Sequence, residues 1–202
     1  EGCTHPNATN YDETANIDDG SCEYETVQIG HQVWMTENLK ATHYRNGDAI
    51  LEIDNDAWFS TTEGAFNIPE DANIYGNLYN WYVAIDDRDI CPESYHIPTY
   101  EEWILLSDYV GGESLSGGKL KECTQGSCPE SEFWNSPNIG ATNSSGFTAL
   151  PAGWIYDNGI EFTGDRTIIW SSTSADNTFA YDFKLSNETS SVIEDWSQKD
   201  LL

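Results

Sequence analysis

The sequence predicts an α+β fold, in which helices early in the chain are followed by a run of strands. Three observations predict it. A complete capping pattern marks a helix that begins at Thr99, and the segments after residue 146 are rich in β-forming residues. Aromatic residues, which suit the half-buried surface of a sheet, make up 13% of the 202 residues. Since 38% of the chain is hydrophobic, we expect a packed core rather than disorder.

The first residues, 1–23, are expected to form a small module separate from the main domain, residues 24–202. Almost all residues of the module form turns or carry side-chain oxygens, and Cys3 and Cys22 bracket it. A disulfide between these cysteines would close a loop of roughly 20 residues and stabilise the fold by roughly 3 kcal/mol.

Oxygen-bearing side chains in this module are candidate calcium ligands, because calcium prefers oxygen. Their spacing matches only part of an EF-hand loop, since no Glu stands at the closing position. The alternative is a set of Asx turns closed by the disulfide, with no ion. The candidate ligands are Asn10, Asp12, Asn16, Asp18 and Asp19.

The remaining cysteines predict one further disulfide and one leftover thiol. Cys123 and Cys128 bracket a turn-like Thr-Gln-Gly-Ser spacer, so we expect them to pair. Cys91 is then unpaired or intermolecular. Carboxylates flank it in Asp89-Ile90-Cys91-Pro92-Glu93 and would raise its pKa, which disfavours a catalytic thiol. Disulfides place the chain outside the reducing cytosol, in the extracellular space or on a cell surface.

Before Thr99 the pattern predicts short strands, loops and one helix. Residues 27–39 alternate between apolar and polar around a tight turn at Gly30-His31. Residues 41–75 are polar and irregular, so we expect long loops there. Residues 77–85 place apolar side chains at helical spacing and predict a helix.

The helix at Thr99 has the strongest local pattern. Thr99 and Glu102 form a capping box, in which each side chain satisfies the other's backbone N–H. A buried stripe of Trp103, Leu106 and Val110 follows, and Gly111-Gly112 ends the helix. Strands are then predicted over residues 146–154, 167–173, 179–185 and 191–196.

The charge balance excludes two classes of partner. Asp and Glu number 35 against 8 Lys and Arg, a formal net charge of −27. Such a surface repels nucleic acid and anionic lipid, and no stretch approaches the roughly 20 apolar residues of a membrane span. The chain starts at Glu1, so we expect a removed signal peptide or an excised fragment. Glycosylation sequons stand at Asn7, Asn143 and Asn187.

An ordered set of segments resembles the Fibrobacter succinogenes major paralogous domain, a bacterial family. Together the segments span residues 26–185, and it is their common order that is specific. They are Gly30–Leu39, Leu78–Trp81, Cys91–Thr99, Glu102-Trp103, Gly111-Gly112, Lys119–Lys121, Phe147–Trp154 and Trp170–Thr173.

The resemblance implies a C-type-lectin-like α+β fold with two helices and a twisted, mostly antiparallel sheet, on exported bacterial proteins. The module resembles a short Cys-bounded repeat that is often suspected of binding calcium. Members of the family usually continue into a last strand whose cysteine plausibly pairs with the one matching Cys91, but this sequence stops at Leu202. The resemblance therefore implies a lost last strand, or a neighbouring molecule that completes the sheet.

No enzyme motif is present. The sequence lacks a nucleophile elbow, a phosphate loop and a His-Glu-x-x-His zinc pattern, and its four histidines are dispersed. We therefore expect a non-enzymatic surface protein that acts by adhesion or ligand binding. Its partner would be a carbohydrate or protein, with aromatic side chains exposed for sugar stacking at Trp58, Phe59 or Trp134. The alternative is a filament or sheath subunit that binds copies of itself by strand addition.

Overall fold

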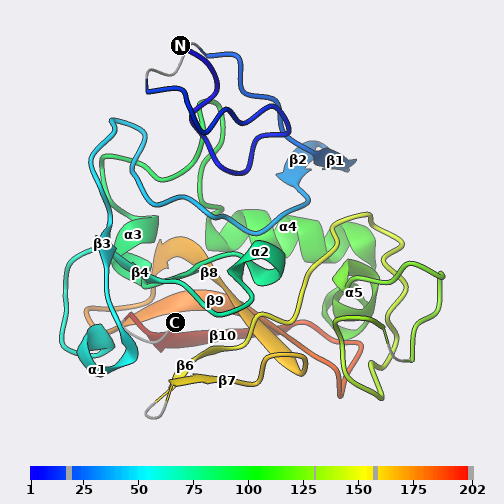
Figure 1. Cartoon of the computed structure of the whole chain (residues 1–202). Helices are drawn as coiled ribbons and strands as arrows, with labels where there is room; N and C mark the ends of the chain where they lie inside the picture. The colour runs from blue at the N-terminus through cyan, green and yellow to red at the C-terminus, as the bar shows by residue number, and fades with distance from the viewer. Residues whose placement is uncertain (17–19, 130, 157–158, 200–202) are drawn as a thin grey trace.

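The structure is a computed structural model that describes residues 1–16, 20–129, 131–156 and 159–199. It has an α+β fold with several antiparallel sheets, as predicted (Figure 1). The helices are α1 (Asn55–Trp58), α2 (Ala72–Tyr75), α3 (Trp81–Ala84), α4 (Tyr100–Val110) and α5 (Glu113–Leu120). The strands are β1 (Thr26–Ile29), β2 (Gln32–Met35), β3 (Leu51–Glu52), β4 (Ala65–Asn67), β5 (Leu78–Tyr79), β6 (Trp154–Tyr156), β7 (Gly159–Glu161), β8 (Arg166–Ser174), β9 (Phe179–Ser186) and β10 (Ile193–Gln198).

The largest sheet is antiparallel, in the order β10-β9-β8, and confirms the last three predicted strands. Along β9 the residues alternate between two faces, because successive side chains of a strand point to opposite sides. Phe183 and Leu185 belong to the largest core cluster, together with Trp103 and Leu106 of α4. The rings of Trp103 and Phe183 stack with their centroids 5.1 Å apart. One face of the sheet is thus covered by α4.

Helix α4 begins and ends as its sequence predicts. The Thr99 side chain accepts a hydrogen bond from the backbone N–H of Glu102, and the Glu102 side chain accepts one from the backbone N–H of Thr99. Gly111 follows the last helical residue with φ of 131°, a conformation that a side chain would strain. Local chemistry therefore predicts both ends of this helix, and a bond of 3.0 Å from the Tyr100 N–H to the Thr173 hydroxyl adds a tertiary contact at its start.

Helix α5 was not predicted, because a Gly-Gly pair ordinarily weakens a helix. In the structure the two glycines lie where the helix touches other backbone. A side chain at Gly117 would collide with the carbonyl oxygen of Ser191, and one at Gly118 with that of Gly140. The glycines are needed for this close approach.

Two further predictions are only partly right. The expected helix over 77–85 is the short strand β5 followed by α3, because Asn80 makes tertiary hydrogen bonds in place of helical ones. Its side chain accepts from the backbone N–H of Ala65 at 3.0 Å and donates to the Glu63 carbonyl at 2.8 Å. The expected strand over 146–154 is an extended loop with single bridges, Lys121 to Ala149 and Gly153 to Thr167, that lead into β6.

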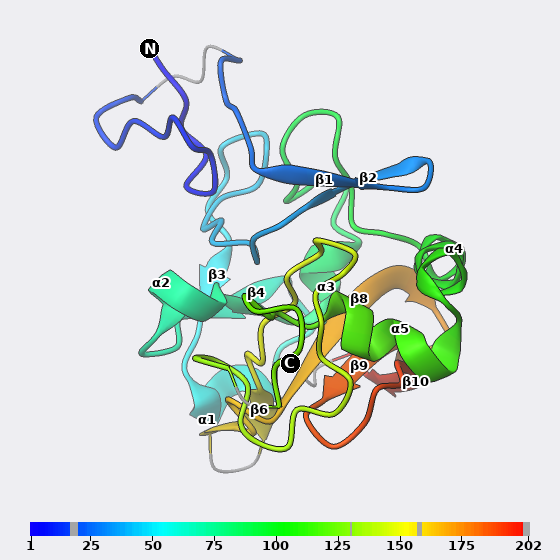
Figure 2. The same cartoon turned by 90° about the vertical axis from the view of Figure 1, so that its right-hand side faces the viewer.

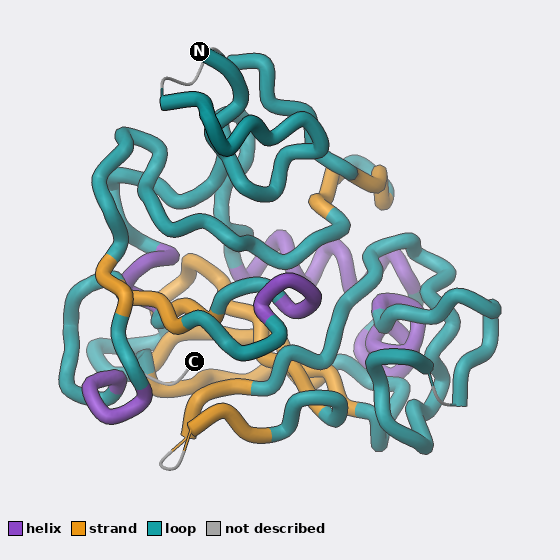
Figure 3. Tube along the Cα trace, viewed as in Figure 1, coloured by secondary structure: helices purple, strands orange, loops and turns teal. Residues whose placement is uncertain are grey.

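The loops predicted over 41–75 also contain short elements, namely β3, α1, β4 and α2 (Figure 3). Strands β3 and β4 pair in parallel, and β4 and β5 pair antiparallel. They form a small sheet beside the large one (Figure 1).

The hairpin of β1 and β2 confirms the strands expected on either side of Gly30. It lies apart from the large sheet, beside the N-terminal module (Figures 1 and 2). The module is tied by a Cys3–Cys22 disulfide, and a second disulfide joins Cys123 and Cys128, so both predicted bonds are present.

Candidate functional site

A cavity of about 690 Å³ lies between the β1–β2 hairpin and the large sheet. Its lining comes from β2 and the segment that follows it to Leu39, from residues 94–98, from the start of α4 and from β8 residues 167–170. Figure 2 shows the hairpin and β8 on opposite sides of this region. The volume is that of a typical small-molecule or side-chain binding site.

The lining is mainly apolar, and much of it is aromatic. The Trp34 ring lies 4.8 Å from the Trp103 ring and 5.6 Å from the Phe147 ring. Trp103 donates its indole N–H to the Trp170 carbonyl at 3.3 Å, and Trp170 donates to the Tyr79 carbonyl at 3.1 Å. These bonds hold two of the indoles in fixed orientations.

The third indole, Trp34, is different. It is 9% exposed, and its Nε1–H has no hydrogen-bond partner among the described residues. A buried donor is almost always satisfied by protein, water or ligand. An unsatisfied donor on a cavity-lining side chain therefore favours an occupant that carries a hydrogen-bond acceptor.

The polar side chains of the lining mostly bond within the protein. Gln32 donates to the Glu102 carbonyl at 2.9 Å, and Asn38 donates to the Tyr75 carbonyl at 2.8 Å. His96 pairs with the Glu102 carboxylate at 3.1 Å. Burial tends to raise the pKa of Glu102, but its bonds to the Thr99 N–H and to His96 outweigh burial and lower that pKa. This carboxylate caps α4 and stays ionised.

Cys91 also lines the cavity, and it is the free cysteine of the chain. Its thiol is buried, and burial, with the nearby charge of Asp89, raises its pKa to about 12. Arg45 fixes the surrounding loop, with bonds of 2.9 Å to the Cys91 and Pro92 carbonyls and an ion pair of 2.8 Å to Asp89. Burial and the charge of Asp89 therefore both favour the protonated thiol at neutral pH.

The expected sugar-stacking surface is wrong for two of its three residues. Trp58 is 0% exposed and packs with Leu78 and Ile155, while Trp134 is 1% exposed and donates its indole N–H to the Ala149 carbonyl at 2.9 Å. Both are core side chains, because large aromatic surfaces are most stabilising when buried. Phe59, at 39% exposed, remains on the surface.

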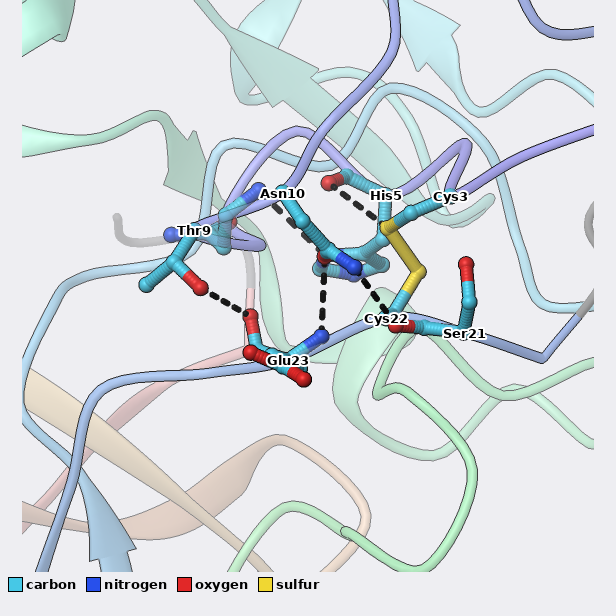
Figure 4. The surroundings of a disulfide bond; sticks show 8 residues. Cys3, His5, Thr9, Asn10, Ser21, Cys22 and Glu23 are labelled. Atoms are coloured by element: carbon cyan, nitrogen blue, oxygen red, sulfur yellow. Dashed lines mark hydrogen bonds between the residues drawn. A yellow bond between two sulfur atoms is a disulfide. The ribbon is translucent and has the colours of Figure 1, made fainter.

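The calcium candidates are brought together only in part. Asn10 donates to the Ser21 carbonyl at 2.6 Å and accepts from the Glu23 N–H at 3.0 Å, which ties the two ends of the module (Figure 4). Asp12 accepts from the backbone and hydroxyl of Thr14, and these bonds lower its pKa. Both arrangements agree with the Asx-turn alternative.

Asn16 is exposed, and Asp18 and Asp19 lie outside the described residues. Within the described part of the chain, no three His, Cys, Asp or Glu side chains lie close enough together to hold a metal ion. Calcium binding by the module therefore stays a prediction.

The three sequon asparagines all use their side-chain amides within the fold. Asn7 donates to the Asn38 carbonyl at 2.7 Å, Asn143 to the Thr148 hydroxyl at 3.0 Å and Asn187 to Asp165 at 3.0 Å. Asn7 and Asn187 are each only 6% exposed. All three amide nitrogens therefore donate at least one hydrogen bond within the fold.

No helix among residues 1–16, 20–129, 131–156 and 159–199 has the length and apolarity that crossing a membrane requires.

The cavity itself was not predicted, because its lining comes from segments far apart in the sequence. One signal could have found it. Much of the lining comes from segments that carry the family resemblance, among them residues 30–39, 78–81, 91–99 and 102–103.

Comparison with known families gives one match. The model of the family described as Fibrobacter succinogenes major domain matches residues 27–199, which include every residue that lines the cavity. No curated protein and no solved structure matches the chain.

Proposed function

Because the chain belongs to the Fibrobacter succinogenes major domain family, which suggests a surface-associated protein, we propose that it acts by binding a partner in the cavity between β2 and β8. The observation that carries this proposal is the cavity of about 690 Å³ with a mainly apolar, aromatic lining and the unsatisfied Nε1–H of Trp34. The two disulfides are consistent with an extracellular protein.

The lining favours an extended polypeptide segment with apolar side chains as the partner. A sugar needs several polar side chains free to bond its hydroxyls, whereas Gln32, Asn38 and Asn80 are already engaged within the protein. An extended peptide offers apolar side chains to the rings and a backbone carbonyl to the Trp34 N–H. The net charge of −27 adds a preference for basic residues beside that segment.

Catalysis has little support at this site. The thiol of Cys91 is held protonated by its raised pKa, and the Glu102 carboxylate is engaged with Thr99 and His96. Neither group has a pKa near 7, which a nucleophile or general base working at neutral pH needs. The proposed role is therefore binding without turnover.

Filling part of the cavity should weaken binding. We expect the neutral apolar dye N-phenyl-1-naphthylamine to bind the chain, with energy transfer from Trp34, Trp103 and Trp170. Ala84→Phe adds a ring to the cavity wall. It should raise the dissociation constant of the dye roughly tenfold or more, because the ring takes up space that the dye occupies. Fluorescence titration measures the dissociation constant of the dye.

The matched control is Ala175→Phe, the same change at an exposed turn. Equal affinity of the dye for both variants would show that the dye binds elsewhere.

A peptide array and a glycan array then identify the class of partner. Peptides with alternating apolar residues should be retained and displaced by the dye, whereas retention of glycans alone would exclude the peptide proposal.

We also propose that the domain is C-type-lectin-like. The support is a pair of helices, α4 and α5, beside a twisted antiparallel sheet, with long loops that build the cavity (Figure 3). This arrangement fits a scaffold that displays binding loops on rigid elements.

Calcium is the proposed ligand of the module. Asp12 is ionised, and the oxygen-rich composition suits a hard cation. Adding calcium to the EDTA-treated chain should raise its melting temperature, since a ligand of the folded state stabilises it. An unchanged melting temperature together with no heat of binding in calorimetry would contradict calcium binding.

Assembly of copies by strand addition, the alternative function, would use the outer strand β10. Its Ile193 and Trp196 are exposed, at 43% and 57%. However, Glu194 and Asp195 lie on the same strand, and carboxylates brought together at such an edge would repel. The cavity is therefore the preferred binding surface.

A further inference from the structure

We propose that the disulfide-closed module of residues 1–23 is a clamp on the cavity, and that Asn7 is its positioning residue. The module contacts one wall of the cavity directly and a second wall through Tyr24, the residue that follows it, and so holds the two walls together. This inference rests on the proposed function, since it concerns how firmly the same cavity retains its ligand.

The first wall is the segment after β2. Asn7 donates to the Asn38 carbonyl at 2.7 Å and accepts from the Lys40 N–H at 2.7 Å, so one amide side chain bonds the backbone at two points. Asn7 is only 6% exposed, and buried hydrogen bonds are costly to break. On its other side the segment is held by the body of the domain, where the Asn77 N–H donates to the Leu39 carbonyl at 2.9 Å. Asn38 and Leu39 both line the cavity.

The second wall is the loop around Tyr95. Tyr24, directly after the module, meets the Tyr95 ring edge-on at 5.8 Å, and His5 meets the Tyr24 ring at 5.4 Å. Edge-to-face aromatic pairs at such distances are attractive. Tyr95 also lines the cavity. The module therefore bonds the wall at residues 38–40 directly, and it reaches the wall at Tyr95 through Tyr24.

The disulfide makes this double contact stiff. Cys3 and Cys22 join the two ends of the module, and Asn10 and Thr9 tie its middle to Ser21 and Glu23 (Figure 4). Asn7 lies inside the closed loop and Tyr24 lies two residues beyond it. The cross-link thus fixes the separation between the residue that holds one wall and the residue that holds the other.

Loosening the clamp should accelerate ligand release. Asn7→Ala removes both bonds to residues 38 and 40, which should raise the dissociation constant of N-phenyl-1-naphthylamine roughly tenfold. Most of the change should appear in the dissociation rate, because the walls no longer stay closed on the bound dye. Stopped-flow fluorescence on the full chain measures both rates.

Asn177→Ala is the matched control, since Asn177 is exposed in the turn before β9. Hydrogen exchange at the Lys40 amide should accelerate in Asn7→Ala and stay unchanged in Asn177→Ala, while urea unfolding reports the global stability of both. Tyr24→Leu weakens the second contact and should raise the dissociation rate roughly threefold. This second variant tests the clamp if Asn7→Ala does not fold.

The two proposals fail in different ways. If the unmodified chain does not bind the dye, the proposed function is wrong. If the unmodified chain binds the dye but Asn7→Ala and Tyr24→Leu release it at the rate of Asn177→Ala, the clamp alone is wrong. Faster exchange at the Lys40 amide in Asn7→Ala without faster release of the dye would also overturn the clamp.

Discussion

Replacing Lys121 with methionine is expected to lower the free energy of unfolding by roughly 3 kcal/mol or more. The Lys121 side chain is 0% exposed. Its ammonium donates to the carbonyls of Ile139, Ser186 and Thr189 at 3.0, 2.8 and 3.0 Å. It also lies 5.3 Å from the centre of the Trp134 ring, a cation–π distance. No other described side chain bonds all three of these segments.

The loss follows from what methionine leaves behind. Its side chain fills a similar volume but donates no hydrogen bonds, so three inward-facing carbonyls lose a partner. Burial lowers the pKa of Lys121 to about 8, which leaves the ammonium protonated in most molecules at pH 7. The substitution thus removes charge-assisted bonds, which are the stronger kind.

Urea unfolding of Lys121→Met and Lys119→Met measures the effect. Lys119 is two residues earlier on α5 and only half-buried, so its substitution should change the unfolding free energy by less than about 1 kcal/mol. Equal unfolding midpoints for the two variants would show that the three carbonyls do not depend on Lys121.

Replacing Asp182 with asparagine is expected to stabilise the protein at pH 7.5 by about 2 kcal/mol. Asp182 is 0% exposed, and neither carboxylate oxygen makes a hydrogen bond of good geometry to a described residue, although the Ser197 hydroxyl lies near it and partly offsets its burial. The nearest cation is Lys184, 3.6 Å away, and that lysine bonds Asp195 at 2.7 Å instead. Burial, only partly offset by Lys184, raises the pKa of Asp182 to about 6.

The pH dependence follows from this raised pKa. Between the ordinary value of 3.8 and about 6, the folded chain binds more protons at Asp182 than the unfolded chain does. The contribution of Asp182 to unfolding free energy is therefore most favourable below pH 4 and is lost as the pH rises to about 6. Asp182→Asn should gain stability over the unmodified chain across that window and match it near pH 4.

Asp195→Asn is the control for this prediction. Asp195 stands opposite Asp182 in the register of β9 and β10. Burial tends to raise the pKa of Asp195, but the bond and charge of Lys184 together with a bond from the Trp196 backbone outweigh burial and lower that pKa. Since the Asp195 side chain is 43% exposed, its substitution should lower the free energy of unfolding by at most about 1 kcal/mol. A stability gain in both variants would show that general charge repulsion, and not burial, is responsible.

Local chemistry allowed the ends of α4 and both disulfides to be predicted. Thr99, Glu102 and Gly111 act through bonds to neighbouring backbone, so their spacing contains the whole signal. The alternation along β9 predicted the strand but not its burial, since Ala180 and Asp182 on one face and Phe183 and Leu185 on the other are all buried. The fold class and the strands at the end of the chain followed from such patterns.

What the sequence did not reveal depends on contacts between distant segments. Burial of Trp58 and Trp134 is decided by residues far from them in the chain, so composition could not separate core tryptophans from exposed ones. Gly117 and Gly118 appear unfavourable for a helix until Ser191 and Gly140 are placed against them. The cavity likewise exists only once β2 and β8 are both in place.

A host that attaches sugars to nascent chains is a poor choice for producing this protein. Asn7-Ala8-Thr9 is an acceptor triplet, and a glycan added there would sit on the nitrogen that the folded chain turns toward the Asn38 carbonyl. The bulky sugar would then keep the first residues from seating against the segment after β2. Bacterial secretion without such modification delivers the chain with that amide free to turn inward.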